Sequence, residues 1–169
     1  MKKIKFFALA ALLLGSTSAF AAITKGEKQT VNGVQYEVLT VFANASSGDN
    51  TVKVTSNNYS GTTLVIPATV DLPIEGTDPF GNDVTGTKTF KVVEIATAAG
   101  VGAFENCTSI TSVQIGANVT KIGDNAFKGC TKLTSITFDA AAANQTFGAN
   151  ILEGTKVATL DLTLRRLPN

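Results

Sequence analysis

The residue types that most often carry chemistry are scarce in this sequence, and its two cysteines are the first to consider. The chain contains Cys107 and Cys130 and no histidine. Without histidine it cannot form a Ser-His-Asp or a Cys-His arrangement, so nucleophilic catalysis of those kinds is excluded. Two cysteines also fall short of the four ligands of a structural zinc ion. We therefore expect no metal and no cofactor.

Four carboxylates in one short segment are the second candidate for chemistry: Asp71, Glu75, Asp78 and Asp83. A pair of carboxylates can act as acid and base, and a cluster can hold calcium. Their spacing matches no calcium-loop pattern, and residues 78–83 have the composition of a turn. The turn interpretation is therefore favoured, and the sequence predicts a protein that is not an enzyme.

The elements that position these residues follow a leader-like N-terminus. Three lysines in residues 1–5 precede an apolar run, residues 6–14, that is too short to span a bilayer. Small residues in Ala19–Ala21 predict cleavage after Ala21, and Ser16 stands where a lipoprotein would have its cysteine. We expect an exported protein that is not a lipoprotein, with secreted, periplasmic and cell-surface locations left open.

The charge balance excludes nucleic acid as a partner. The chain has 14 basic and 13 acidic residues, and loss of the three leader lysines leaves 11 basic residues and a net charge of about −2. No basic patch is present. Neither is there a Walker-type glycine loop, or an apolar stretch of membrane-spanning length in the mature chain.

Residues 22–61 have the alternation of apolar and polar side chains that is typical of strands. It runs over residues 34–42 and 51–55, and a loop rich in Ser, Gly and Asn separates the two at residues 44–50. An antiparallel β-hairpin is the simplest interpretation. It would cap the sheet that follows, since an exposed strand edge invites association.

Further along, two segments repeat at a constant offset of 23 residues: GAFENCTSITSVQI from Gly102 and NAFKGCTKLTSITF from Asn125. Phe104 thus matches Phe127, and Cys107 matches Cys130. A fixed period of this length, with apolar residues spaced as L-x-x-L-x-L, marks a leucine-rich repeat.

Weaker copies flank these two units. A third begins at Thr146 with an offset of 24 or 25 residues. An earlier one is split: residues 64–70 align with residues 113–119, and residues 92–95 align with residues 119–122. The intervening residues 71–91 are rich in Gly, Pro and Asp, and we expect a loop insertion there.

These units resemble the BspA-type leucine-rich repeat, which is common among surface and secreted proteins of Bacteroidetes. The resemblance covers roughly residues 62–162 through the IG..AF..C..L..I.I signature. It implies a β-rich solenoid of about three to four repeats of roughly 23 residues over residues 62–169, after a signal peptide (1–21) and an N-terminal hairpin region (22–61). Four extra residues between Ile95 and Ala103, and a cysteine missing near Thr155, depart from the pattern.

The repeat alignment separates an inward from an outward set of residues. The predicted core is Phe104, Cys107, Ile110, Val113, Ile115, Ile122, Phe127, Cys130, Leu133, Ile136, Phe138, Leu160 and Leu162. The candidate partner-binding face is Thr111, Ser112, Gln114, Thr134, Ser135, Thr137, Thr159 and Asp161. This second set is a weakly charged lattice of hydroxyls, and without a partner it is an ordinary solvent-facing surface.

Cys107 and Cys130 occupy equivalent places on adjacent rungs, where a rung is the turn of the solenoid that one repeat forms. Rungs in a parallel ladder lie about 4.7 to 4.9 Å apart, which is within the range of Cα distances that a disulfide spans. Two buried thiols that pack as small apolar groups are the favoured interpretation, and a disulfide stays an alternative.

The resemblance implies a cell-surface or secreted binding module, because its family is associated with adhesion. The partner would be a host extracellular-matrix protein, another cell surface or a glycan. A structural spacer or a truncated array with no ligand of its own is the alternative, since there are few repeats and no recognisable cap over the last one.

Overall fold

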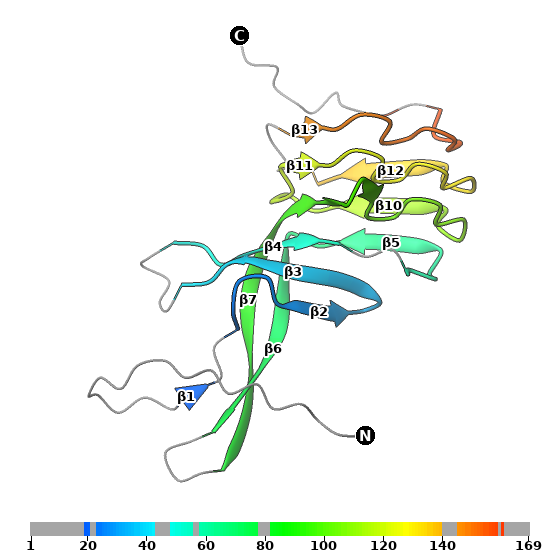
Figure 1. The fold of residues 1–169 in the computed structure, drawn as a ribbon. Coiled ribbons are helices and arrows are strands. Elements are labelled where there is room, and N and C mark those ends of the chain that lie inside the picture. Colours follow the sequence, from blue (N-terminus) through cyan, green and yellow to red (C-terminus); the bar gives the residue numbers. More distant parts are fainter. Residues whose placement is uncertain are drawn as a thin grey trace.

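The computed structural model describes residues 19–20, 23–42, 48–55, 58–77, 82–139, 145–158 and 160, and this part of the chain consists of strands and turns without a helix (Figure 1). The strands are β1 (Ala19–Phe20), β2 (Lys28–Val31), β3 (Val34–Thr40), β4 (Thr51–Val54), β5 (Thr63–Ile66), β6 (Thr69–Thr77), β7 (Asp83–Ile95), β8 (Thr97–Ala98), β9 (Val101–Gly102), β10 (Ser112–Ile115), β11 (Lys121–Ile122), β12 (Ser135–Phe138) and β13 (Thr146–Phe147).

Two parallel ladders form the walls of a solenoid. Strands β5, β10 and β12 make one ladder, in which Leu64, Val113 and Ile136 lie side by side. The end of β7 joins β11 and β13 in the other, where Lys121 pairs with Glu94. Residues that share a repeat position are thus lateral neighbours, which confirms both the predicted solenoid and the split early copy.

The insertion at residues 71–91 is a hairpin, so the prediction of a loop was wrong. Strands β6 and β7 pair antiparallel from Thr69 with Lys91 to Thr77 with Asp83, and the hairpin projects from the body (Figure 1). The physical reason is the alternation along the strands: Leu72 is buried and its neighbour Pro73 is exposed. This period of two outweighs the turn-like composition.

The N-terminal strands extend the β7 ladder at one end. Strand β3 pairs antiparallel with β2 and with β4, and β4 runs parallel to β7. The pairing of β3 with β4 confirms the predicted hairpin. Strand β2 adds a second hairpin through Asn32 and Gly33, whose φ angles of 51° and 78° suit a two-residue turn. Strand β1 pairs with the far end of β6.

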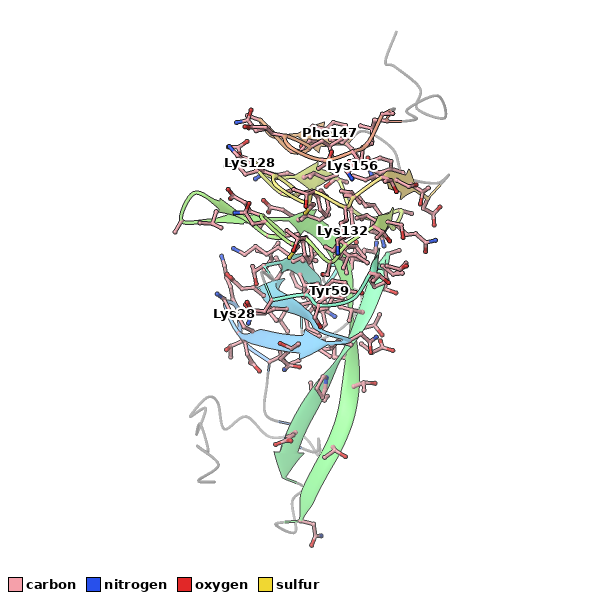
Figure 2. The ribbon with its side chains drawn as sticks, turned by 90° about the vertical axis from the view of Figure 1, so that its right-hand side faces the viewer. Lys28, Tyr59, Lys128, Lys132, Phe147 and Lys156 are labelled. Atoms are coloured by element: carbon pink, nitrogen blue, oxygen red, sulfur yellow. The ribbon has the colours of Figure 1, made fainter. Side chains whose placement is uncertain are left out.

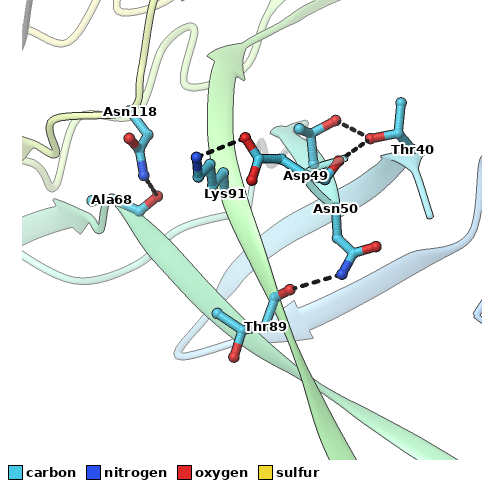
Figure 3. A network of polar contacts seen from close by, with 8 residues as sticks. Thr40, Asp49, Asn50, Ala68, Thr89, Lys91 and Asn118 are labelled. Atoms are coloured by element: carbon cyan, nitrogen blue, oxygen red, sulfur yellow. Dashed lines mark hydrogen bonds and ion pairs between the residues drawn. The ribbon is translucent and has the colours of Figure 1, made fainter. Parts of the chain in front are cut away.

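Polar contacts fix the root of the projecting hairpin (Figure 3). The Lys91 ammonium lies 2.7 Å from an Asp49 carboxylate oxygen, which joins β7 to the loop between β3 and β4. On the other side the Asn118 amide donates to the Ala68 carbonyl oxygen at 3.0 Å. The hairpin is therefore held by the N-terminal strands and by the next rung.

An aromatic column runs through the core. Phe104 and Phe127 are fully buried and stack with ring centroids 5.6 Å apart at an angle of 4°. Tyr59 meets Phe104 edge-on, with centroids 6.4 Å apart. Tyr59 therefore fills the first rung's aromatic position, although it lies outside the residues that match the repeat pattern.

The four extra residues between Ile95 and Ala103 form a small hairpin of β8 and β9. Its turn residues, Ala99 and Gly100, have φ angles of 51° and 82°. This departure from the repeat pattern is thus absorbed by a hairpin that leaves Ile95 and Ala103 buried in the stack.

Candidate functional site

The predicted partner-binding face lies on the ladder of β5, β10 and β12. Because inward side chains such as Val113 and Ile115 are buried, the residues between them point outward. The outward residues are Thr63 and Val65 on β5, Ser112 and Gln114 on β10, and Ser135 and Thr137 on β12. The register places Ser112 beside both Thr63 and Ser135, so these six side chains form one lattice.

Three threonine hydroxyls of the predicted face bond to the backbone of the preceding rung, and that of Thr137 donates to the Val113 carbonyl oxygen at 3.4 Å. The Thr111 hydroxyl donates to the Thr62 carbonyl oxygen at 3.1 Å, and the Thr134 hydroxyl donates to the Thr111 carbonyl oxygen at 3.1 Å. These hydroxyls tie each rung to the preceding one. The structure thus brings Ser112, Gln114, Ser135 and Thr137 together on the strands and places Thr111 and Thr134 at the ladder's margin.

Three sequence-predicted residues lie outside the described residues: Thr159 and Asp161 of the face, and Leu162 of the core. The other core residues are buried, except Phe138 and Leu160, which are half-buried.

Thr63 and Val65 belong to this surface but were missed. Val65 is 49% exposed and lies beside Gln114. The signal was available, since the alignment of residues 64–66 with residues 113–115 assigns Val65 the place of Gln114. The six outward residues carry no charge, so a partner here would be recognised by shape and neutral hydrogen bonds.

Of the four carboxylates, the two on β6 do not come together. Asp71 and Glu75 lie four residues apart on β6, about 13 Å along an extended strand, and the Thr89 hydroxyl donates to Asp71. Asp78 is outside the described residues, and no cluster of three metal-binding side chains occurs in the part of the chain that the structure describes. The geometry therefore does not support a calcium or acid–base site at Asp71 and Glu75.

A hollow of about 310 Å³ lies on the opposite ladder, along Gly123 and Gly148. Two of its charged groups are paired with each other: the Lys121 ammonium lies 2.8 Å from a Glu94 carboxylate oxygen. The hydrogen bond and the negative charge of Glu94 raise the pKa of Lys121. Such a lysine stays protonated and is not a general base.

Both cysteines are buried thiols whose sulfurs point to the preceding rung. The Cys130 thiol donates to the Phe104 carbonyl oxygen at 3.1 Å, and the Cys107 sulfur lies 3.9 Å from the Tyr59 carbonyl oxygen. Burial raises the pKa of both, that of Cys130 to about 12. Because thiolate is the reactive form, neither side chain is suited to be a nucleophile at neutral pH.

Burial of the two thiols and of a tyrosine makes the stability of the fold sensitive to alkaline pH. Desolvation also raises the pKa of Tyr36 from 10.0 to about 12. The folded chain thus binds protons that the unfolded chain loses above about pH 9 to 10, so stability should fall from there toward pH 12. Chemical denaturation at stepped pH should show this fall, and Tyr36→Phe should reduce its slope. An identical slope in the variant would contradict the assignment to Tyr36.

The stacked parallel rungs and their aromatic column define a leucine-rich-repeat solenoid. The family model described as "BspA type Leucine rich repeat region (6 copies)" matches residues 80–167, just over half of the chain. The chain belongs to this family. The membership supports a repeat-based binding or adhesion module.

One of three similar solved structures, the first named below, supports the fold with a TM-score above 0.5. The pneumococcal vaccine antigen PcpA has 21% identity and a TM-score of 0.55 over 80% of this chain and 32% of its own. A leucine rich cell surface protein from Faecalibacterium prausnitzii has 26% identity and a TM-score of 0.47 over 74% of this chain and 27% of its own. A leucine-rich repeat protein from Bacteroides capillosus has 20% identity and a TM-score of 0.48 over 78% of this chain and 95% of its own.

The chain thus spans about a third or less of the first two of these proteins. The search of curated proteins found no match. Within the described residues, no helix is long and apolar enough to cross a membrane.

Proposed function

We propose that this protein is an exported, non-catalytic binding or adhesion module that recognises a protein or glycan through the outward face of β5, β10 and β12. The observation that carries the proposal is the lattice of six uncharged outward side chains in register on three adjacent strands. A flat, rigid surface of this kind binds without a large loss of conformational entropy, and solenoids present such faces to partners.

The proposed location is outside the inner membrane, after cleavage behind Ala21. The lysines and the apolar run of residues 1–14 support secretion, and Ser16 supports a protein without a lipid anchor. On this proposal the mature chain is residues 22–169, with an N-terminal hairpin region to residue 61 and the repeats beyond it. Its partner classes are a host extracellular-matrix protein, another cell surface and a glycan.

The test is binding of residues 22–169 to an array of matrix proteins and glycans. The variant changes Ser112, Gln114, Ser135 and Thr137 to Lys. Four long cations on the lattice should block a flat partner, so we expect at least about a tenfold loss of affinity, which is 1.4 kcal/mol or more.

The matched control changes four exposed threonines elsewhere to Lys: Thr85, Thr87, Thr120 and Thr146. Its affinity should stay within about twofold of the parent. Equal losses in both variants would locate recognition away from this face. No binding by a parent chain shown to be folded would favour the structural spacer.

A further inference from the structure

Charged residues of the solenoid lie in columns, in which each rung contributes one equivalent position. Two columns alternate in sign. In one, Glu94 precedes Lys121 and the two are paired at 2.8 Å. In the other, Glu105, Lys128 and Glu153 follow one another, and the Lys128 ammonium lies 3.0 Å from Glu153. Alternation of this kind stabilises a ladder, whereas like charges on adjacent rungs destabilise it.

The third column does not alternate. Lys132 and Lys156 directly precede the core residues Leu133 and Val157 and occupy equivalent places on successive rungs. The Lys156 amide donates to the Leu133 carbonyl oxygen at 2.8 Å, so the two rungs are in direct backbone contact here. Figure 2 shows both lysines on the solenoid edge that carries the turns, above Tyr59.

Neither ammonium is neutralised within the described residues. Lys132 and Lys156 are exposed, and no carboxylate of the described chain lies within ion-pair distance of them. The other three described lysines between residues 91 and 156 each have a carboxylate partner. The contrast makes this edge a place where an external anion relieves a repulsion that the fold leaves in place.

Two hydroxyl groups lie on the same edge as the two lysines. Thr108 and Thr131 are exposed and hold equivalent positions one rung apart, with Thr131 next to Lys132. Among the described residues the hydroxyls of Thr108 and Thr131 have no hydrogen-bond partner. The two hydroxyls therefore form a column on the same edge, beside the column of the two cations.

We propose that this edge binds an acidic polysaccharide, bearing sulfate or carboxylate groups, that runs along the solenoid axis. Rungs repeat about every 4.7 to 4.9 Å, and a polysaccharide with one or more anionic groups on each sugar presents negative charge at a comparable density along its chain. An extended acidic peptide presents same-side carboxylates about 6.6 Å apart and loses register with the rungs. The site is distinct from the neutral face of β5, β10 and β12.

The test is the affinity of residues 22–169 for heparin, measured by calorimetry at low and at physiological ionic strength. Lys132→Gln with Lys156→Gln should weaken binding by about tenfold or more, since two of the contacting charges are lost. Binding should also weaken as salt rises. Neutral dextran should not bind.

The matched control is Lys91→Gln with Lys121→Gln, which removes the same charge from lysines that are already paired. It should change heparin affinity by less than about twofold. Equal weakening in both double variants would overturn the proposal, as would the absence of heparin binding by the folded parent. Tighter binding of polyglutamate than of heparin would also overturn it in favour of an acidic peptide. The two proposals fail separately, because heparin binding is tested by removing charge at Lys132 and Lys156, whereas recognition by the neutral face is tested at the outward residues of β5, β10 and β12.

Discussion

Phe127→Ala is expected to lower the free energy of unfolding by about 3 to 5 kcal/mol, the range for loss of a buried phenylalanine. Phe127 is fully buried and stacks on Phe104 with centroids 5.6 Å apart. It is the last ring of the aromatic column, so its loss opens a cavity against the ring of Phe104 in the preceding rung. Thermal unfolding followed by circular dichroism should show a fall in melting temperature on the order of 10 °C.

The control for this experiment is Val101→Ala. Val101 is 49% exposed in the small hairpin of β8 and β9 and supports no second rung. Its truncation should change stability by less than about 0.5 kcal/mol. If Phe127→Ala were as mild as this control, the aromatic column would not be a main source of stability.

Gly102→Ala should be nearly as damaging, for a different reason. A Cβ atom at Gly102 would lie 1.9 Å from the Asn125 carbonyl oxygen and 2.3 Å from the Asn125 carbonyl carbon. These are backbone atoms of the next rung, so no side-chain rotation relieves the collision. We expect a loss of about 3 kcal/mol or more, measured by urea unfolding.

Gly100→Ala separates this collision from a purely conformational effect. Gly100 has a φ of +82° and no atom within 4 Å of an added Cβ. Alanine there should cost about 1 to 2 kcal/mol, through the left-handed backbone alone. An effect of Gly102→Ala no larger than that of Gly100→Ala would mean that the rungs separate easily.

The solenoid was predictable because its period is written in the sequence. Residues 23 apart, such as Val113 and Ile136, become lateral neighbours. Residues that align between two repeats in the sequence therefore pair with each other on adjacent strands. The same logic placed Leu64 beside Val113 across a long insertion. In a repeat protein, comparison of two repeat sequences identifies contacts between residues that are far apart in the chain. A fold without repeats offers no such comparison.

Features outside the period were harder to predict. The hairpin of β6 and β7 carries Pro73 and several glycines, and composition alone assigned it to a loop. Tyr59 completes the aromatic column from a segment that has no sequence similarity to the repeats. For Tyr59 the deciding factor is packing against a neighbour that sequence periodicity does not identify. For the hairpin the deciding factor is the alternation along its strands, which composition obscured.

The candidate face was predictable in outline only. Alternation correctly separates Gln114 and Thr137 from the buried residues beside them. It does not reveal that the Thr111 and Thr134 hydroxyls are engaged by carbonyl oxygens of the preceding rung. Threonine at a strand margin serves the backbone or a ligand with the same hydroxyl, and only the geometry distinguishes the two roles.

The number of residues between paired strands differs from one rung to the next, and this difference favours an order of folding. Ser112 pairs with Ser135 across 23 residues but with Thr63 across 49, so closing the first rung costs about 0.7 kcal/mol more in loop entropy. The hairpin of β6 and β7 lies inside that longer loop, and its formation from local contacts shortens the loop that remains. The hairpin should therefore form before the first rung closes, which makes it a folding device for the solenoid beside it.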